Sequence, residues 1–213
     1  AWHAVDPAEV RAMPARDKIT WDIDRNGQHI GLRQPPPGLK NWSTPLAPMI
    51  GCLGVAPDMG QFISTATSGP FGGNMDYNGI REGTTIRFPV SEKGALFFIG
   101  DVHGAQGDGE IAGTGIETSA EVQFTVKAIK GKPQAWPRGE TATDIFAIGN
   151  ARPLEQALQH ATTEMLRWLA DDYGLDRVAA SHPPAMAVRY DVANVLNPAF
   201  PVANALPEIW AFG

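Results

Sequence analysis

The stretch Gly94-Ala95-Leu96-Phe97-Phe98-Ile99-Gly100 contains the longest apolar run in the chain. Five apolar residues suit a β-strand and fall far short of the ~20 that a membrane-spanning helix needs. A loop rich in glycine and acidic residues follows directly, and loops at strand ends commonly carry functional groups. We therefore predict a β-rich protein with a site just beyond this strand, and no membrane span.

Short strands joined by tight turns are predicted around this stretch. Of the 23 glycines, 15 fall between Gly51 and Gly115, and dense glycine indicates turns or close backbone approach. Val122, Phe124 and Val126 alternate with polar residues, which is typical of a half-buried strand. The predicted strands are residues 84–90, 94–100, 120–129, 143–148 and 200–206, with a hairpin turn at 91–94.

One long amphipathic helix is predicted in the C-terminal third. Apolar residues recur with helical spacing over residues 154–169, after Pro153 at the expected first helical position and before Gly174 as the expected end. A second short helix is predicted near residues 183–184. The apolar stripe of the long helix is interpreted as core packing without a chemical role.

The predicted fold is mainly β, with an α+β C-terminal part. β-Sandwich-like sheets form the body, and the one long helix packs on them. Residues 1–50, which include the stiff Pro35-Pro36-Pro37 piece, are predicted to form an irregular N-terminal arm. Residues 51–213 are predicted to form a β-rich catalytic domain with a C-terminal helix.

The charge balance argues against polyanion-binding classes. The 213 residues carry 17 Lys and Arg against 23 Asp and Glu, a formal net charge of −6, and no basic cluster. Binding to nucleic acid or to acidic membranes needs such clusters, so neither partner is expected. The lone cysteine, Cys52, excludes an internal disulfide framework and fits a reducing compartment, so we expect a cytoplasmic location.

The loop after the apolar strand, residues 100–110, concentrates reactive side chains. Close carboxylates repel one another unless a cation or hydrogen bonds compensate. Asp, Glu and His are the usual ligands of divalent metals, so the pattern favours a metal site over the alternative, a solvated acidic turn. The reactive side chains of the loop are Asp101, His103, Gln106, Asp108 and Glu110.

Three further places could join this site. Asn74 and Asp76 lie in a glycine-rich stretch, Gly72–Asp76, that is either part of a site or an ordinary turn. Glu117 enters an apolar alternation and is either exposed or directed into the site. Cys52 is either a buried inert thiol or a nucleophile activated by a base. Motifs of serine-hydrolase elbows, zinc-binding helices and phosphate-binding loops are absent from the sequence.

These stretches resemble the acetamidase/formamidase family of amide hydrolases. The resemblance is carried by residues 51–57 (GCLGVAP), 72–76 (GGNMD), 89–97, 100–110 (GDVHGAQGDGE) and 113–117 (GTGIE), and more weakly by 189–194. Members of the family usually carry a further N-terminal part, and this sequence is expected to begin after it. Part of the site is therefore expected on a segment outside this sequence or on another chain.

The resemblance implies hydrolysis of short linear amides, of the formamide or acetamide type, to a carboxylate and ammonia. It also implies a divalent metal in some members and self-association into a homo-oligomer. We assign Asp76, Asp101 and His103 to the metal, with zinc favoured and calcium as the alternative. Coordination lowers the pKa of a water from ~15.7 towards ~7 and supplies a nucleophile strong enough for an amide.

The remaining candidates are assigned to catalysis and substrate binding. Glu110 is the first choice for general base and acid, followed by Glu117 and Asp108. Asn74 and Gln106 are assigned to orienting the substrate amide. Two alternatives stay open at this stage: an amidase that uses Cys52 as nucleophile, and a non-catalytic β-sandwich module with a structural metal loop.

Overall fold

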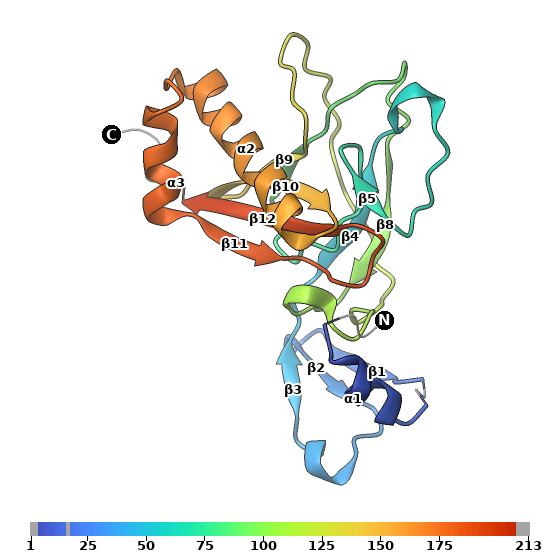
Figure 1. Ribbon diagram of the computed structural model, residues 1–213. Helices are drawn as coiled ribbons and strands as arrows, with labels where there is room; N and C mark the ends of the chain where they lie inside the picture. The colour runs from blue at the N-terminus through green and yellow to red at the C-terminus, as the bar shows by residue number, and fades with distance from the viewer. Residues whose placement is uncertain (1–3, 16–17, 208–213) are drawn as a thin grey trace.

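The structure is a computed structural model that describes residues 4–15 and 18–207. Its described strands form three antiparallel sheets, and its main helices are α1 (Pro7–Ala12), α2 (Leu154–Tyr173) and α3 (His182–Ala187) (Figure 1). In sheet order, the strands are β1 (Trp21–Asp24), β2 (His29–Leu32) and β3 (Ser43–Pro45); then β5 (Ser68–Gly69), β6 (Gly72–Asn74), β4 (Met49–Gly54) and β8 (Phe98–His103); then β11 (Arg189–Val192), β12 (Phe200–Pro207), β10 (Asp144–Ala151), β9 (Arg138–Glu140) and β7 (Thr85–Arg87).

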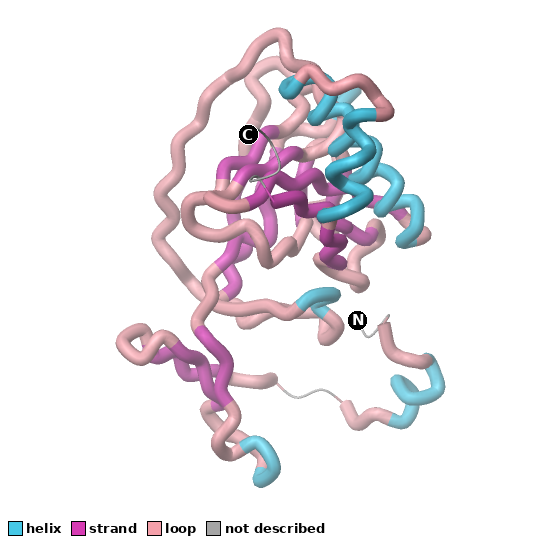
Figure 2. The backbone as a smooth tube through the Cα atoms, turned by 90° about the vertical axis from the view of Figure 1, so that its left-hand side faces the viewer, coloured by secondary structure: helices cyan, strands magenta, loops and turns pink. Residues whose placement is uncertain are grey.

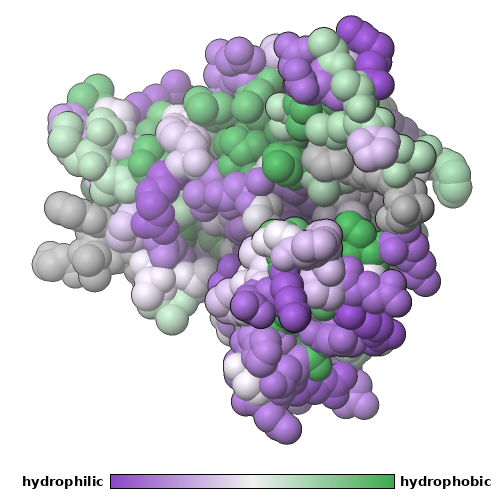
Figure 3. Space-filling model, turned by 90° about the horizontal axis from the view of Figure 1, so that it is seen from below, coloured by the Kyte–Doolittle hydropathy of each residue, from purple (hydrophilic) through white to green (hydrophobic). Residues whose placement is uncertain are grey.

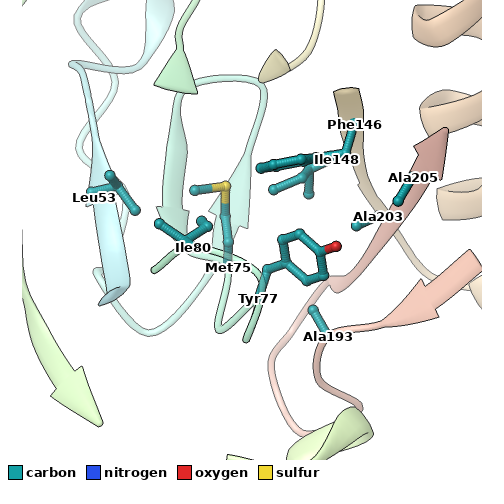
Figure 4. Packing of buried hydrophobic residues seen from close by; sticks show 9 residues of the cluster. All are labelled: Leu53, Met75, Tyr77, Ile80, Phe146, Ile148, Ala193, Ala203 and Ala205. Carbon is teal, nitrogen blue, oxygen red and sulfur yellow. The ribbon is translucent and has the colours of Figure 1, made fainter. Parts of the chain in front are cut away.

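The four-stranded and five-stranded sheets enclose a hydrophobic core. Met75 and Tyr77 lie between Leu53 of β4 on one side and Phe146 and Ile148 of β10 on the other (Figure 4). The rings of Tyr77 and Phe146 meet edge to face, with centroids 5.1 Å apart. Ile80, Ala193, Ala203 and Ala205 complete the cluster. The predicted fold, mainly β with sandwich-like sheets, is confirmed.

The long helix α2 covers the other face of the five-stranded sheet (Figure 2). Met165, Trp168 and Leu169 of the helix pack on β10 and β12, so the predicted apolar stripe is core. The helix ends at Gly174, whose φ of +68° favours glycine, as expected. It begins one residue later than predicted, because Pro153 is its N-cap. None of the described helices is long and apolar enough to cross a membrane.

Other predicted elements hold in part. Strand β12 and helix α3 confirm the expected terminal strand and short helix. Residues 94–97 do not form a strand, because Ala95 and Leu96 have left-handed φ angles of +58° and +52°, and β8 starts only at Phe98. The turn at 91–94 joins two different sheets and is no hairpin, because β7 and β8 do not pair.

The predicted strand at residues 120–129 is wrong. The segment is a loop without a strand partner in the described part of the chain, and Val122, Phe124 and Val126 are 39%, 53% and 65% exposed. Alternating apolar and polar residues make a segment compatible with a β-strand. A strand forms only where a neighbouring strand is available to pair with it.

The N-terminal 50 residues are more regular than predicted. They contain α1 and the three-stranded sheet β1-β2-β3, which forms a lobe below the two larger sheets in Figure 1. The surface of this lobe is largely hydrophilic when seen from below (Figure 3). Ile30 of β2 is fully buried, and its Cδ1 lies beside Gly104 at the end of β8. The lobe therefore packs against the segment that carries the acidic loop.

Candidate active site

Five of the predicted site residues converge at the end of β8. Asp101 and His103 lie on β8, Asp76 follows β6, Glu110 ends a 3₁₀ turn, and Glu117 forms a β-bridge with His103. Ligand atoms of Asp76, Asp101 and His103 lie within 4.8 Å of one another. The same holds for His103, Glu110 and Glu117, so the imidazole is shared by both sets. We refer to these five residues as the acidic cluster.

Two glycines create the space in which the acidic cluster forms. A Cβ on Gly51 would lie 2.5 Å from Asp101 Oδ2 and 2.6 Å from Asp76 Oδ1. A Cβ on Gly115 would collide with the imidazole ring of His103. The glycines at these two positions therefore allow close approach of reactive side chains, as their density in the sequence indicated.

The imidazole of His103 is buried and held by the side chain of Gln106. The Nε2 amide group of Gln106 donates to the backbone oxygens of Asp76 and Ala193, at 2.6 and 3.2 Å, which fixes the orientation of that amide. Its Oε1 then accepts from His103 Nδ1 at 2.8 Å. Nδ1 therefore carries a proton, and Nε2 faces Asp101 Oδ1 and Glu117 Oε1, each at 3.3 Å.

The carboxylates set the charge of this imidazole. Burial alone would lower the pKa of His103, but the hydrogen bond to Asp101 and the charges of Glu117 and Asp101 outweigh it and raise the pKa to about 9. The hydrogen bond from His103 in turn lowers the pKa of Asp101. The raised pKa favours the positively charged form of His103, which attracts the neighbouring carboxylates.

Asp76 is a buried carboxylate in which one oxygen accepts several hydrogen bonds and the other, called here the open oxygen, accepts none from the described residues. Its Oδ2 accepts from the side-chain amides of Asn74, Asn194 and Asn197 at 2.6, 3.1 and 3.3 Å. Its Oδ1 has no hydrogen-bond partner among the described residues. Burial, followed by the charge of Glu110, raises the pKa of Asp76 to about 8. The open oxygen therefore faces the cluster without a compensating donor.

Glu110 repeats this pattern. It is 7% exposed, its Oε2 lacks a hydrogen-bond partner within the described chain, and burial raises its pKa. Asp76, Asp101 and Glu110 also share left-handed backbone angles, with φ of +45°, +60° and +42°. Non-glycine residues adopt such angles at a cost of about 1–3 kcal/mol each, and such strain gathers at functional sites.

The other predicted residues lie differently. Asp108 is exposed, accepts from Asn78 Nδ2 at 2.8 Å and stays outside the acidic cluster. The side-chain amide of Gln106 hydrogen-bonds to His103 and to two backbone oxygens, so Gln106 positions the imidazole. The side-chain amide of Asn74 donates its hydrogen bond to Asp76 Oδ2. Whether Asp108, Gln106 or Asn74 contacts substrate remains a prediction.

Sequence reasoning missed two residues and left one open. Asn194 and Asn197 are buried and bind Asp76 from more than a hundred residues away, and only the weak family match at 189–194 pointed to that region. Cys52 is buried, and burial, followed by the charges of Asp101 and Asp76, raises its pKa to about 11. A thiol so hard to ionise is a poor nucleophile.

A cavity of about 430 Å³ lies apart from the acidic cluster. Tyr77, Asn78, Arg81, Asp144 and Arg189 are among its lining residues, and no member of the cluster lines it. Chemistry at a carbonyl carbon needs a nucleophile and a proton donor, and the acidic cluster offers groups suited to both. We therefore place the candidate active site at the cluster and not in this cavity.

Comparisons with known proteins find similarity to one enzyme family. A model of the acetamidase/formamidase family matches residues 61–164, which include all five members of the acidic cluster. An acetamidase from Mycolicibacterium smegmatis is 39% identical over 84 residues, which are 39% of this chain and 20% of that protein.

Solved structures extend the match. An acetamidase from Bacillus halodurans has a TM-score of 0.80 and 33% identity, covering 89% of this chain and 61% of that chain. An acetamidase from Yersinia enterocolitica has a TM-score of 0.74 and 33% identity, covering 82% of this chain and 52% of that chain. This chain thus spans about half to three fifths of these solved relatives.

Proposed function

From the confirmed resemblance to the acetamidase/formamidase family, we propose that the chain is an amidase that hydrolyses the C–N bond of short linear amides to a carboxylate and ammonia. The observation that carries this proposal is the acidic cluster itself. It gathers four carboxyl groups and one imidazole, and leaves one oxygen each of Asp76 and Glu110 without a described donor. Buried carboxyl oxygens without hydrogen-bond donors lower the stability of the fold unless a bound ligand compensates for the missing donors.

The donor set fits a divalent cation. The open oxygens need a positive partner, and the proton on Nδ1 of His103 leaves Nε2 as the ligand atom of the neutral imidazole. Asp76, Asp101 and His103 would hold the ion, and the imidazole favours zinc over calcium, which takes oxygen ligands. When bound, such a cation lowers the pKa of water and polarises the amide carbonyl.

The protein's own groups supply the proton transfers. Glu110 is buried with a raised pKa, which suits a carboxyl group that takes a proton from water and passes it to the leaving nitrogen. Glu117 is 57% exposed, contacts His103 Nε2 and accepts from Thr114 Oγ1 at 2.9 Å. It lies where the cluster opens to solvent, so we assign it to the entrance of the site.

Ammonia release from formamide and acetamide tests the function. We predict that Glu110→Gln lowers kcat by a factor of about 100 or more, because the variant cannot shuttle the proton. Glu155→Gln is the matched control, since Glu155 is an exposed acid of helix α2 outside the acidic cluster, and it should keep activity near that of the wild type. Full activity in Glu110→Gln would contradict the role of Glu110 as general base and acid. A wild-type protein that releases no ammonia but is stabilised by calcium would favour a structural metal loop instead.

A further inference from the structure

The loop that joins β11 to β12, residues 193–199, contacts three separate parts of the candidate active site. The carbonyl oxygen of Ala193 accepts from Gln106 Nε2 at 3.2 Å, and the same side chain holds the imidazole. The backbone N–H of Val195 donates to the oxygen of Gly109 at 3.0 Å, in the 3₁₀ turn that ends with the proposed proton-transfer group. The third contact joins two side chains of the loop to the buried carboxylate that carries the open oxygen.

Two asparagines of this loop present their amide N–H groups to Asp76, and backbone groups fix their orientation. The Oδ1 atom of Asn194 accepts from the backbone N–H of Asn197 at 3.2 Å, so its Nδ2 faces Asp76 Oδ2 at 3.1 Å. The Nδ2 atom of Asn197 donates to the backbone oxygen of Asn74 at 2.9 Å and reaches the same carboxylate oxygen at 3.3 Å. Neither amide can therefore flip without losing a hydrogen bond to the backbone.

The converging amides hold Asp76 through one oxygen only. All three side-chain donors that the structure describes, two of them from the loop, meet at Oδ2. Turning the carboxylate would break these bonds in a buried place, where lost hydrogen bonds to a charged group are costly. The open oxygen therefore keeps its position beside the carboxylate of Asp101, within the acidic cluster.

The loop is anchored to the body of the protein independently of the acidic cluster. Ala193 is 2% exposed within the core, and its N–H donates to the oxygen of Pro201 at 3.0 Å. Arg152 Nη2 donates to the oxygen of Asn197 at 2.8 Å, and the guanidinium lies over the ring of Phe200. Side chains held from behind in this way can fix the direction of a metal ligand.

We propose that Asn194 and Asn197 are positioning residues of the active site, which hold the open oxygen of Asp76 towards a divalent cation. The inference rests on the proposed function, because it takes Asp76 as one of the ligands of the ion. The asparagines act through Asp76 and not by contact with the substrate. Groups that orient a ligand commonly set the affinity for the metal, so loss of either asparagine should weaken metal binding beyond any general loss of stability.

Alanine variants of buried asparagines separate positioning from stability. Asn194→Ala and Asn197→Ala should each weaken zinc binding to the metal-free protein by about tenfold or more. Asn204→Ala is the matched control, because Asn204 is fully buried, as Asn194 is, and accepts from the backbone N–H of Ala147 at 3.2 Å. Its neighbours in β12 face the core between the sheets, so strand alternation places its side chain on the opposite, helix-covered face. Asn204→Ala should destabilise the fold but change the zinc dissociation constant by less than about twofold.

Two measurements on the same proteins test the inference. Competition with a chromogenic chelator gives the zinc dissociation constant, and urea unfolding without metal gives the loss of stability. A wild type that binds zinc, with loop variants that bind it as tightly as Asn204→Ala does, would overturn the inference alone. So would loop variants that do not fold while Asn204→Ala does, since the two asparagines would then be structural. A wild type that binds no zinc would instead overturn the metal site of the proposed function, and the inference with it.

Discussion

Gly51 keeps open the space in which two buried carboxylates meet. An added Cβ at this position must displace the oxygens of Asp101 and Asp76 that it would approach to 2.5 and 2.6 Å. We predict that Gly51→Ala lowers the free energy of unfolding by about 1–3 kcal/mol and weakens zinc binding by about tenfold or more. Urea unfolding and zinc titration measure the two effects.

The matched control for this change lies on the neighbouring strand. Gly100 of β8 pairs with Cys52, and a Cβ added there meets nothing within 4 Å. Gly100→Ala should therefore leave zinc affinity unchanged. Equal loss of affinity in both variants would show that strand geometry, and not the space beside the carboxylates, controls the site.

At this scale, the sequence predicted which acids and which imidazole form the cluster. Asp101 and His103 lie on one strand and Glu110 follows it in the next turn, so their proximity is a local property. The amide donors to Asp76 were not predictable, because Asn194 and Asn197 reach it only through the pairing of sheets far apart in sequence. Asp108 lies outside the cluster, because spacing alone does not show which way a turn residue points.

At the scale of the element, Asp172 ties the end of α2 to its surroundings. Its Oδ1 accepts from Lys132 Nζ at 2.6 Å, and its Oδ2 from Trp168 Nε1 at 3.1 Å and Arg87 at 3.2 Å. Burial alone would raise the pKa of Asp172, but these hydrogen bonds and charges outweigh it and lower the pKa. A lowered pKa in the folded state means that ionised Asp172 stabilises the fold.

We predict that Asp172→Asn lowers the free energy of unfolding by about 0.5–1 kcal/mol at neutral pH. The difference from the wild type should be fully present above the unfolded pKa of ~4 and vanish as the pH falls through the folded pKa. Urea unfolding at neutral and acid pH measures it. Asp171, 54% exposed and 3.6 Å from Arg138, is the control. An equal loss in Asp171→Asn, or a difference that persists in acid, would contradict the role given to Asp172.

Periodicity predicted the long helix well because its apolar stripe faces one sheet. It could not reveal that Glu164, within that helix, is fully buried and bound to Arg138 Nε at 2.7 Å. Strand prediction was weaker, since the strands of the N-terminal lobe are three or four residues long. Residues 120–129 show the converse, a strong strand pattern without a strand partner among the described residues.

On the scale of the whole molecule, the site exists only where separate segments meet. Gly51 on β4, Asp76 after β6, the end of β8 and the asparagines after β11 are brought together by two sheets packed over one core. The apolar side chains hold these segments rigidly, which is what closely spaced carboxylates require if they are not to move apart.

The most direct test of this account is anomalous X-ray diffraction from crystals grown with zinc, combined with the ammonia assay. We predict an anomalous peak bounded by His103 Nε2 and the carboxylates of Asp76 and Asp101, in a protein that releases ammonia from acetamide. A map that shows these side chains turned away from one another, with no ion among them, in a protein that stays active after exhaustive chelation, would contradict it.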